Sequence, residues 1–152
     1  MGPPLTPLLA ADVVIELIDR DTRPVVLIER KNPPYGWAIP GGFVDRGESV
    51  EAAAIREAYE ETGLVVRLTR LLGCYSDPAR DPRGHTASVV YVGEARGEPQ
   101  ARDDAAAVGL FGPAGFPAAL AFDHARILHD YLNYRRRGEI PPPRPPAAAE
   151  GN

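Results

Sequence analysis

Residues 42–64 read GFVDRGESVEAAAIREAYEETGL, and this stretch says more about the fold than any other part of the chain. Its apolar and charged residues recur as in an amphipathic helix. Ser49 can accept a hydrogen bond from a free backbone amide, as an N-cap residue does. Gly63 suits the C′ position at which helices commonly end. The pattern therefore predicts a helix over about residues 50 to 62.

Three glutamates crowd one side of this expected helix. At about 100° per residue, Glu57, Glu60 and Glu61 fall within roughly one 100° sector of the cylinder. Ile55 and Tyr59 point to the opposite side. Like charges at these spacings repel one another, so their crowding indicates a cation that neutralises them. Hard oxygen ligands of this kind suit Mg²⁺ or Mn²⁺ rather than zinc.

The alternative is a solvated, glutamate-rich helix face, because Arg56 and Glu60 also make a good i,i+4 ion pair. The residues before the helix favour a binding site instead. Residues 37–43 read WAIPGGF, and the adjacent Gly41 and Gly42 let the backbone turn sharply and approach a bound group. The two glycines in front of a carboxylate cluster therefore indicate a ligand site.

Together these residues resemble the Nudix box. The fixed positions of that motif are filled at the right spacing by Gly42, Glu48, Arg56-Glu57, Glu60-Glu61 and Gly63. The resemblance implies an α/β fold, the Nudix α/β/α sandwich with a mixed central sheet. It also implies hydrolysis of a pyrophosphate linkage with Mg²⁺ or Mn²⁺. Negative oxygens shield that linkage, so attack by water requires charge neutralisation and positioning, which divalent ions supply.

The resemblance also assigns roles to individual residues. Glu57 and Glu61 would be the principal metal ligands, and Glu60 a further ligand or the base that deprotonates water. Three more residues are expected in the site: Gly41 as a backbone carbonyl ligand, Arg56 as the residue that orients the glutamates, and Glu48 as a support for the loop and helix.

A carboxylate from the loop before the last strand often joins the site in this family, and Asp103 and Asp104 lie in that region. A solvated turn is the alternative for these two aspartates, because Gly97 and Pro99 are close in sequence.

Evidence on the substrate lies outside the box. Residues 75–86, 36–44 and 122–125 resemble the corresponding parts of bacterial and archaeal ADP-ribose pyrophosphatases. Arg80 and Arg83 would hold phosphate or ribose oxygens through their forked donors. Tyr35 or Trp37 would stack on a base. These residues also have structural alternatives. The two Asp-Pro pairs are typical of turns. Arg83 and Asp81 can form an ion pair with each other, and Trp37 can pack beside the glycine turn.

Three functions follow from this reading. The leading hypothesis is hydrolysis of ADP-ribose to AMP and ribose 5-phosphate. The second is clearance of oxidised or non-standard nucleoside triphosphates, which uses the same box with a different pocket. The third is a non-catalytic module that senses nucleotide sugars, which the intact glutamates disfavour.

Composition bounds these hypotheses. The chain has 152 residues, a net charge of −4 and one cysteine, so we expect one domain without an internal disulfide. The negative charge argues against a nucleic-acid partner. No apolar run reaches the length of a membrane span and no signal pattern opens the chain, so we expect a cytoplasmic protein without a membrane partner. The expected partner is a small nucleoside diphosphate, and the resemblance makes a homodimer a further expectation.

The rest of the chain divides into strands and helices. Strands are expected at 11–18, 25–30, 64–75, 86–94 and 108–111, with loops at 31–42 and 95–106, and a final helix from the cap Asp123 to Gly138. We therefore expect an N-terminal extension at 1–9, a Nudix domain at 10–138 and a Pro/Ala-rich tail at 139–152.

Overall fold

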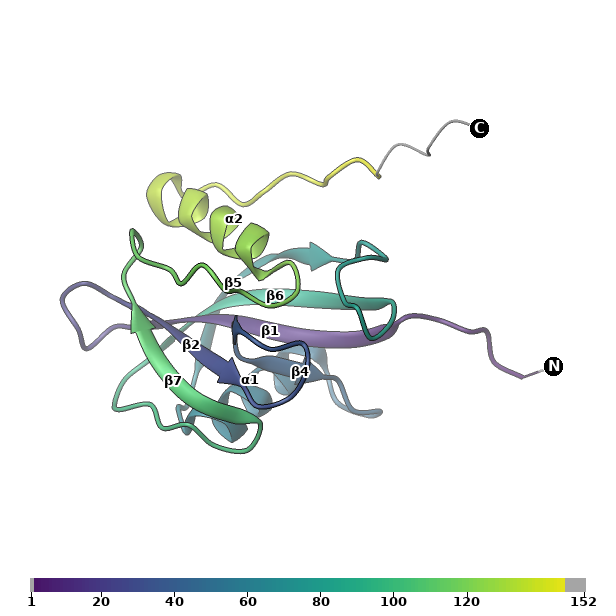
Figure 1. The fold of residues 1–152 in the computed structure, drawn as a ribbon. Helices are drawn as coiled ribbons and strands as arrows, with labels where there is room; N and C mark the ends of the chain where they lie inside the picture. Colours follow the sequence, from purple (N-terminus) through teal and green to yellow (C-terminus); the bar gives the residue numbers. More distant parts are fainter. Residues whose placement is uncertain (1, 147–152) are drawn as a thin grey trace.

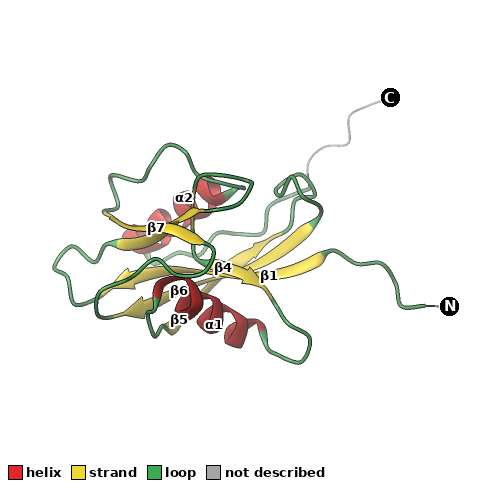
Figure 2. Ribbon diagram, turned by 60° about the horizontal axis from the view of Figure 1, so that its bottom comes forward, coloured by secondary structure: helices red, strands yellow, loops and turns green. Residues whose placement is uncertain are grey.

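A seven-stranded mixed sheet lies between two helices in the computed structural model, which describes residues 2–146 (Figure 1). The elements follow the chain as β1 Leu8–Leu17, β2 Val25–Arg30, β3 Trp37–Ala38, β4 Gly41–Phe43, α1 Val50–Thr62, β5 Arg67–Tyr75, β6 Thr86–Ala95, β7 Ala105–Phe111 and α2 His124–Arg137. Helix α1 covers one face of the sheet and α2 covers the other (Figure 2). The expected α/β/α sandwich is confirmed.

Strand β1 is the centre of the sheet and has different partners along its length. It runs parallel to β6 in unbroken register, from Leu8 opposite Thr86 to Leu17 opposite Ala95. On its other edge β1 pairs with β2 near Ile15 and with β4 over residues 10–12. Strand β2 continues the sheet to β3 and β7. Because β2 and β4 diverge along β1, the sheet is open between them, and this opening holds the site described below.

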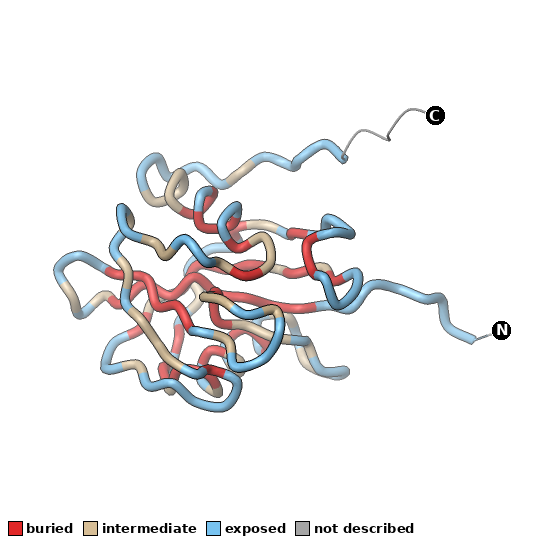
Figure 3. The backbone as a smooth tube through the Cα atoms, viewed as in Figure 1, coloured by how far each residue is buried: buried red, intermediate tan, exposed pale blue. Residues whose placement is uncertain are grey.

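Each helix has buried and exposed residues along its length (Figure 3), and the two helices bury different kinds of residue. On α1 the buried apolar residues are Ala53, Ala54 and Ala58, small side chains that let the helix lie close to the sheet. Ile55 and Tyr59 are 37% and 48% exposed, so the larger apolar residues of this helix face solvent. On α2 the larger apolar residues Ile127, Leu128 and Tyr131 are buried in the second core.

Four sequence-based assignments were wrong in detail. The expected loop 31–42 contains β3 and the start of β4, short strands stabilised by pairing with β2 and β1. Strand β7 begins at Ala105 rather than at residue 108, β1 begins at Leu8 rather than at residue 11, and β5 begins at Arg67 rather than at residue 64. The pairing partners of β4, β7 and the start of β1 lie far away in the sequence, and β3 has only two residues, which is why a local pattern did not reveal these strands.

The expected helix ends are confirmed for α1. The Ser49 hydroxyl accepts a hydrogen bond from the Ala52 amide at 3.1 Å, and Gly63 adopts φ +73°. Asp123 occupies the N-cap position of α2, but its side chain makes no capping hydrogen bond. Its carboxylate is instead engaged by Arg80.

The described part of the tail contacts α2. Arg144 makes two hydrogen bonds to the buried Asp130 carboxylate, at 2.7 and 2.8 Å, and Tyr75 donates to the same group at 2.6 Å. Residues 147–152 of the expected tail lie outside the described residues. No helix within residues 2–146 has the length and apolar character needed to cross a membrane.

Candidate active site

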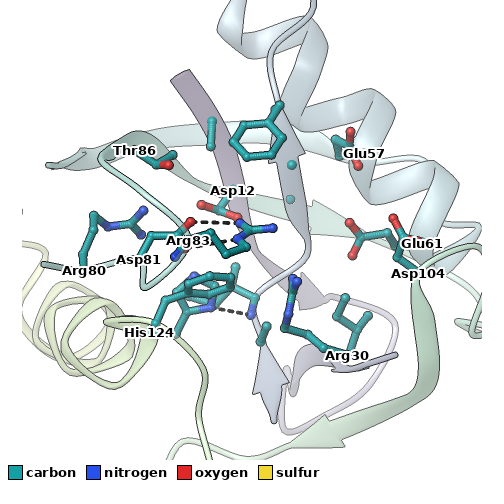
Figure 4. Close-up of a pocket in the computed structure, with 18 residues that line it drawn as sticks. Asp12, Arg30, Glu57, Glu61, Arg80, Asp81, Arg83, Thr86, Asp104 and His124 are labelled. Atoms are coloured by element: carbon teal, nitrogen blue, oxygen red, sulfur yellow. Dashed lines mark hydrogen bonds and ion pairs between the residues drawn. The ribbon is translucent and has the colours of Figure 1, made fainter. Parts of the chain in front are cut away.

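A pocket opens where β2 and β4 diverge from each other along β1. Its lining comes from the strands β1, β2, β3, β4 and β6, from α1 and the first residue of α2, and from the loops before β4, β6, β7 and α2. The polar side chains in the lining are Asp12, Arg30, Glu57, Glu61, Arg80, Asp81, Arg83, Thr86, Asp104 and His124 (Figure 4). Charges of both signs therefore meet in one cavity.

Two of the three predicted helix carboxylates line this pocket. Glu57 and Glu61 are one turn apart on α1, and Glu61 is only 5% exposed. Its Oε2 atom is buried and has no hydrogen-bond partner among the described residues. Burial raises the pKa of Glu61 to about 9, and the charges of Glu57 and Asp12 add to the effect. The pKa of Glu57 is also raised, mainly by burial. Both carboxylates are therefore in a place where a cation would stabilise their ionised form.

Arg56 connects the helix to the loop in front of it. Its guanidinium donates to Glu57 at 2.9 Å, to Glu60 at 3.2 Å, to both oxygens of Glu48 and to the Phe43 carbonyl at 3.1 Å. These hydrogen bonds hold the pKa of Glu48 down at about 2. The Glu60 side chain is 43% exposed and does not line the pocket. Glu48 and Arg56 also lie outside the lining, behind Glu57.

The glycine pair lies directly against carboxylates, as the predicted close approach requires. A Cβ atom at Gly42 would lie 2.5 Å from the carboxyl carbon of Glu57. A Cβ atom at Gly41 would lie 2.0 Å from Oδ1 of Asp12. No side chain larger than hydrogen fits at either position unless a carboxylate moves.

Asp12 is a site residue that the sequence analysis missed. It lies on β1, is 7% exposed, and its Oδ2 accepts a hydrogen bond from the Ser88 hydroxyl. Burial raises its pKa to about 6. A signal was present in the sequence, because an aspartate interrupts the apolar run of a buried strand, where an ionisable residue is costly.

The two arginines predicted to bind substrate line the pocket, and each is paired with an aspartate. Arg80 makes a bidentate contact with Asp123, at 3.0 and 2.7 Å, and its side chain is 4% exposed. Arg83 makes a bidentate contact with Asp81, at 3.1 and 2.9 Å. The Arg83–Asp81 pair that we considered as an alternative is thus present.

The structure does not bring the two predicted stacking residues into the pocket. Tyr35 is 70% exposed and lies outside the lining. Trp37 packs edge-on against Phe111, with ring centroids 5.2 Å apart, in the core beneath α2. The packing alternative therefore describes the position of Trp37.

The predicted loop carboxylates have different positions. Asp104 lines the pocket, whereas Asp103 does not, and the carbonyl of Asp103 accepts a hydrogen bond from Lys31 Nζ at 2.6 Å. His124 is buried and its Nδ1 accepts the Ile39 amide proton at 3.0 Å. Burial lowers the pKa of His124 to about 3, so the imidazole is neutral and can accept this hydrogen bond. His124, Arg30 and Phe122 are lining residues that the sequence analysis did not assign to the site.

The donor set fits a magnesium-like ion. Within residues 2–146, no three His, Cys, Asp or Glu side chains converge to form a metal site by themselves. Mg²⁺ is commonly held by one or two carboxylates, with substrate phosphates and waters completing its shell. The buried Glu61 oxygen, which has no hydrogen-bond partner within residues 2–146 and lies next to Glu57 and the two glycines, fits this mode of binding.

Comparison with known proteins identifies the family. The model of the NUDIX domain matches residues 7–131. The chain is 46% identical over 134 residues to an ADP-ribose pyrophosphatase of Methanocaldococcus jannaschii, covering 86% of this chain and 76% of that one. It is 31% identical over 119 residues to a putative 8-oxo-dGTP diphosphatase of Bacillus subtilis, covering 77% and 76%. Among solved structures, the NUDIX domain of Shewanella oneidensis NrtR in complex with ADP ribose has a TM-score of 0.72 at 27% identity, covering 87% and 89%.

The chain belongs to the NUDIX domain family. Its pocket contains Glu57 and Glu61 of the box, and it is a Nudix pyrophosphohydrolase, an enzyme of a family that generally uses divalent metal ions.

Proposed function

We propose that this enzyme hydrolyses ADP-ribose to AMP and ribose 5-phosphate with Mg²⁺ or Mn²⁺. The proposal rests on one feature of the fold. The three stretches that resemble ADP-ribose pyrophosphatases, residues 36–44, 75–86 and 122–125, all contribute side chains or backbone to the pocket that contains Glu57 and Glu61. The similarity to the M. jannaschii enzyme supports the same substrate.

The residues of the pocket would have different roles in the reaction. Glu57, Glu61 and the Gly41 carbonyl would hold the divalent ion. When bound, that ion would neutralise phosphate oxygens and lower the pKa of a bound water. Arg56 would keep Glu57 oriented through the hydrogen bond described above. Glu60 stays a prediction as a further ligand or base, because it lies beside Arg56 at the margin of the site.

The test is a hydrolysis screen of the purified protein with Mg²⁺ or Mn²⁺. ADP-ribose, other nucleoside diphosphate sugars, dinucleotides and 8-oxo-dGTP would be compared, with products separated by ion-exchange chromatography. We expect AMP and ribose 5-phosphate in equal amounts from ADP-ribose. Activity on triphosphates alone would overturn the proposal and support the second hypothesis. Binding of ADP-ribose without turnover would support the sensing module.

A variant pair checks that the activity comes from this site. Glu61→Gln should lower kcat by orders of magnitude while the protein stays folded. Glu29→Gln is the matched control, because Glu29 is exposed on β2 and lies outside the pocket lining. A homodimer and a cytoplasmic location, both expected from the sequence, stay predictions.

A further inference from the structure

The buried carboxylate of Asp130 is the point at which the tail meets the rest of the fold. Asp130 lies on α2, and its side chain is 4% exposed. Both of its oxygens accept hydrogen bonds from Arg144, and Oδ2 also accepts the hydroxyl proton of Tyr75. The Arg144 guanidinium lies over the Tyr75 ring, with its carbon 6.0 Å from the ring centroid. Three segments, the end of β5, the middle of α2 and the tail, are therefore joined at one carboxylate.

Arg144 supplies a positive charge at this point. Burial raises the pKa of Asp130, but the hydrogen bonds from Arg144 and Tyr75 outweigh burial, and the pKa lies below its ordinary value. Burial also raises the pKa of Tyr75, so its hydroxyl keeps its proton and adds no charge. A buried carboxylate that loses its paired cation either takes up a proton or moves towards solvent. Either change would weaken the hydrogen bond from Tyr75, because charged acceptors make the stronger bonds.

Tyr75 is the last residue before the loop over residues 76–85, which contributes to the pocket. The residues of this loop that line the pocket are Arg80, Asp81 and Arg83. Helix α2 also binds the loop at Asp123, through the bidentate contact with Arg80. Asp123 and Asp130 are seven residues apart, so they lie about two turns from each other on the same side of the helix. The loop is thus attached to α2 at its middle through Asp123 and at its beginning through Asp130.

The tail reaches Asp130 on a stiff run of prolines. Residues 139–146 read EIPPPRPP, so Arg144 has a proline on each side. The tail turns back along α2 towards the end of β5 (Figure 1), and it forms a cleft with Asn133 and Arg137 of the helix. Proline fixes φ and restricts the undocked chain, so less conformational entropy is lost when the segment docks. The prolines therefore favour the contact between Arg144 and Asp130.

We propose that Arg144 is a positioning residue for the hydrolytic reaction, and that it acts through Asp130 and Tyr75 on the loop over residues 76–85. Arg144 itself lies outside the pocket lining. The tail holds the beginning of the loop in place, so the charged side chains of the loop enter the pocket from a fixed backbone. This inference rests on the proposed function for the choice of substrate in its test. A loosened loop should weaken substrate binding and leave the carboxylates of α1, and with them the chemical step, unchanged.

The test separates substrate binding from turnover. KM and kcat for ADP-ribose with Mg²⁺ would be measured for the wild type, Arg144→Met, Arg144→Lys and Tyr75→Phe. We expect KM to rise roughly three- to tenfold for Arg144→Met, with kcat within about twofold of the wild type. Arg144→Lys keeps the charge without the forked donors, so it should recover part of the loss. Tyr75→Phe removes only the hydroxyl and should also raise KM. The two changes together should raise KM by less than the product of their separate effects, because they break one connection.

Two control variants distinguish positioning from general stability. Arg136→Met removes an exposed arginine from the last turn of α2 and should leave KM unchanged. Leu17→Val removes one methylene group from the first core, at the end of β1 that lies away from the pocket. This second variant should lower Tm without raising KM.

Limited digestion with trypsin, with the fragments identified by mass spectrometry, reports on the loop directly. The Arg80 side chain is 4% exposed in the docked loop, so cleavage there requires the loop to open. Arg144→Met should speed cleavage after Arg80 or Arg83. Cleavage after Arg96, which is exposed in another loop, is the internal reference and should not change.

Each outcome is decisive for one of the two proposals. A folded Arg144→Met variant with a KM within about twofold of the wild type would overturn the role of Arg144. A rise in KM without faster cleavage in the loop, or one that Leu17→Val reproduces at the same loss of Tm, would overturn it too. If Arg144→Met does not fold, Tyr75→Phe decides, and wild-type KM in that variant would refute the connection. Wild-type protein that does not hydrolyse ADP-ribose would end the proposed function, and cleavage in the loop would still test Arg144.

Discussion

Replacement of Arg80 by methionine should destabilise the fold, because Arg80 neutralises a carboxylate at the start of α2. The Arg80 side chain is 4% exposed and that of Asp123 is 17% exposed, and two hydrogen bonds join them. Two unit charges about 4 Å apart attract by about 4 kcal/mol at an effective dielectric constant of about 20. Removal of one partner from a buried pair typically costs about 3–5 kcal/mol, because the other charge stays buried without compensation. We therefore expect Arg80→Met to lower the free energy of unfolding by about 3–5 kcal/mol.

Urea unfolding followed by tryptophan fluorescence measures this loss, because Trp37, the single tryptophan, packs in the core beneath α2. A double-mutant cycle separates the pair from other effects. Arg80→Met with Asp123→Asn should be more stable than the sum of the single losses predicts, with a coupling free energy of about 2–3 kcal/mol.

The matched control is Arg67→Met. Arg67 also pairs with a glutamate, Glu94, but its side chain is 75% exposed, and exposed pairs contribute about 0–1 kcal/mol. A loss below about 1 kcal/mol for Arg80→Met, or additive single losses, would refute the structural role of Arg80. In that case its predicted role in substrate binding would become the better explanation for its place in the pocket.

Two further predictions concern the carboxylates. In metal-free protein, Glu61→Gln should raise the free energy of unfolding by about 3 kcal/mol at pH 7 and by less than about 1 kcal/mol at pH 5. The sign follows because the folded carboxyl, with a pKa of about 9, holds its proton where the unfolded one has lost it, so wild-type stability falls as the pH rises from about 4.5 towards 9. Urea titrations in EDTA at both pH values measure this, and an equal effect at both would contradict it. Gly42→Ala should weaken Mn²⁺ binding roughly tenfold or more, because the new Cβ displaces the Glu57 carboxylate. Calorimetry with Mn²⁺ measures the affinity, Gly115→Ala in open space is the control, and equal affinities would show that Glu57 does not hold the ion.

The parts of the fold that were predictable from sequence are those fixed by local interactions. The caps at Ser49 and Gly63 bond within a turn of their own positions, so their residue types suffice to locate α1. The stripe of Ile127 and Tyr131 on α2 is likewise periodic. By contrast, the periodicity placed Ile55 and Tyr59 opposite the glutamates but did not show that the alanines, rather than these larger residues, pack against the sheet. The small alanine side chains let α1 lie close to the sheet. The periodicity of apolar residues alone does not predict this close packing.

The residues of the site were predictable from sequence only where a single segment of the chain contributes several of them. Glu57 and Glu61 are neighbours on one helix, so their spacing brings them into one pocket. Arg80 is paired with Asp123, 43 residues away, and such a partner is invisible in a local pattern. Arg30 ends a strand that reads as ordinary, and its position in the pocket, without an ion pair to any carboxylate of residues 2–146, is a property of the folded chain alone.

Strand β1 pairs with β4 over one part of its length and with β2 over another. The pocket therefore has two halves that are formed by different segments of the chain. Strand β4 and helix α1 bring the glycine pair and the two glutamates, whereas β2, the loop over residues 76–85 and the turn before α2 bring Arg30, the other arginines and Phe122. Both halves adjoin strand β1, which pairs with β6 over its whole length. Substitutions in the second half can therefore alter which molecule is held without disturbing the carboxylates of the first. A library of variants limited to the second half would change substrate choice on an unchanged hydrolytic centre.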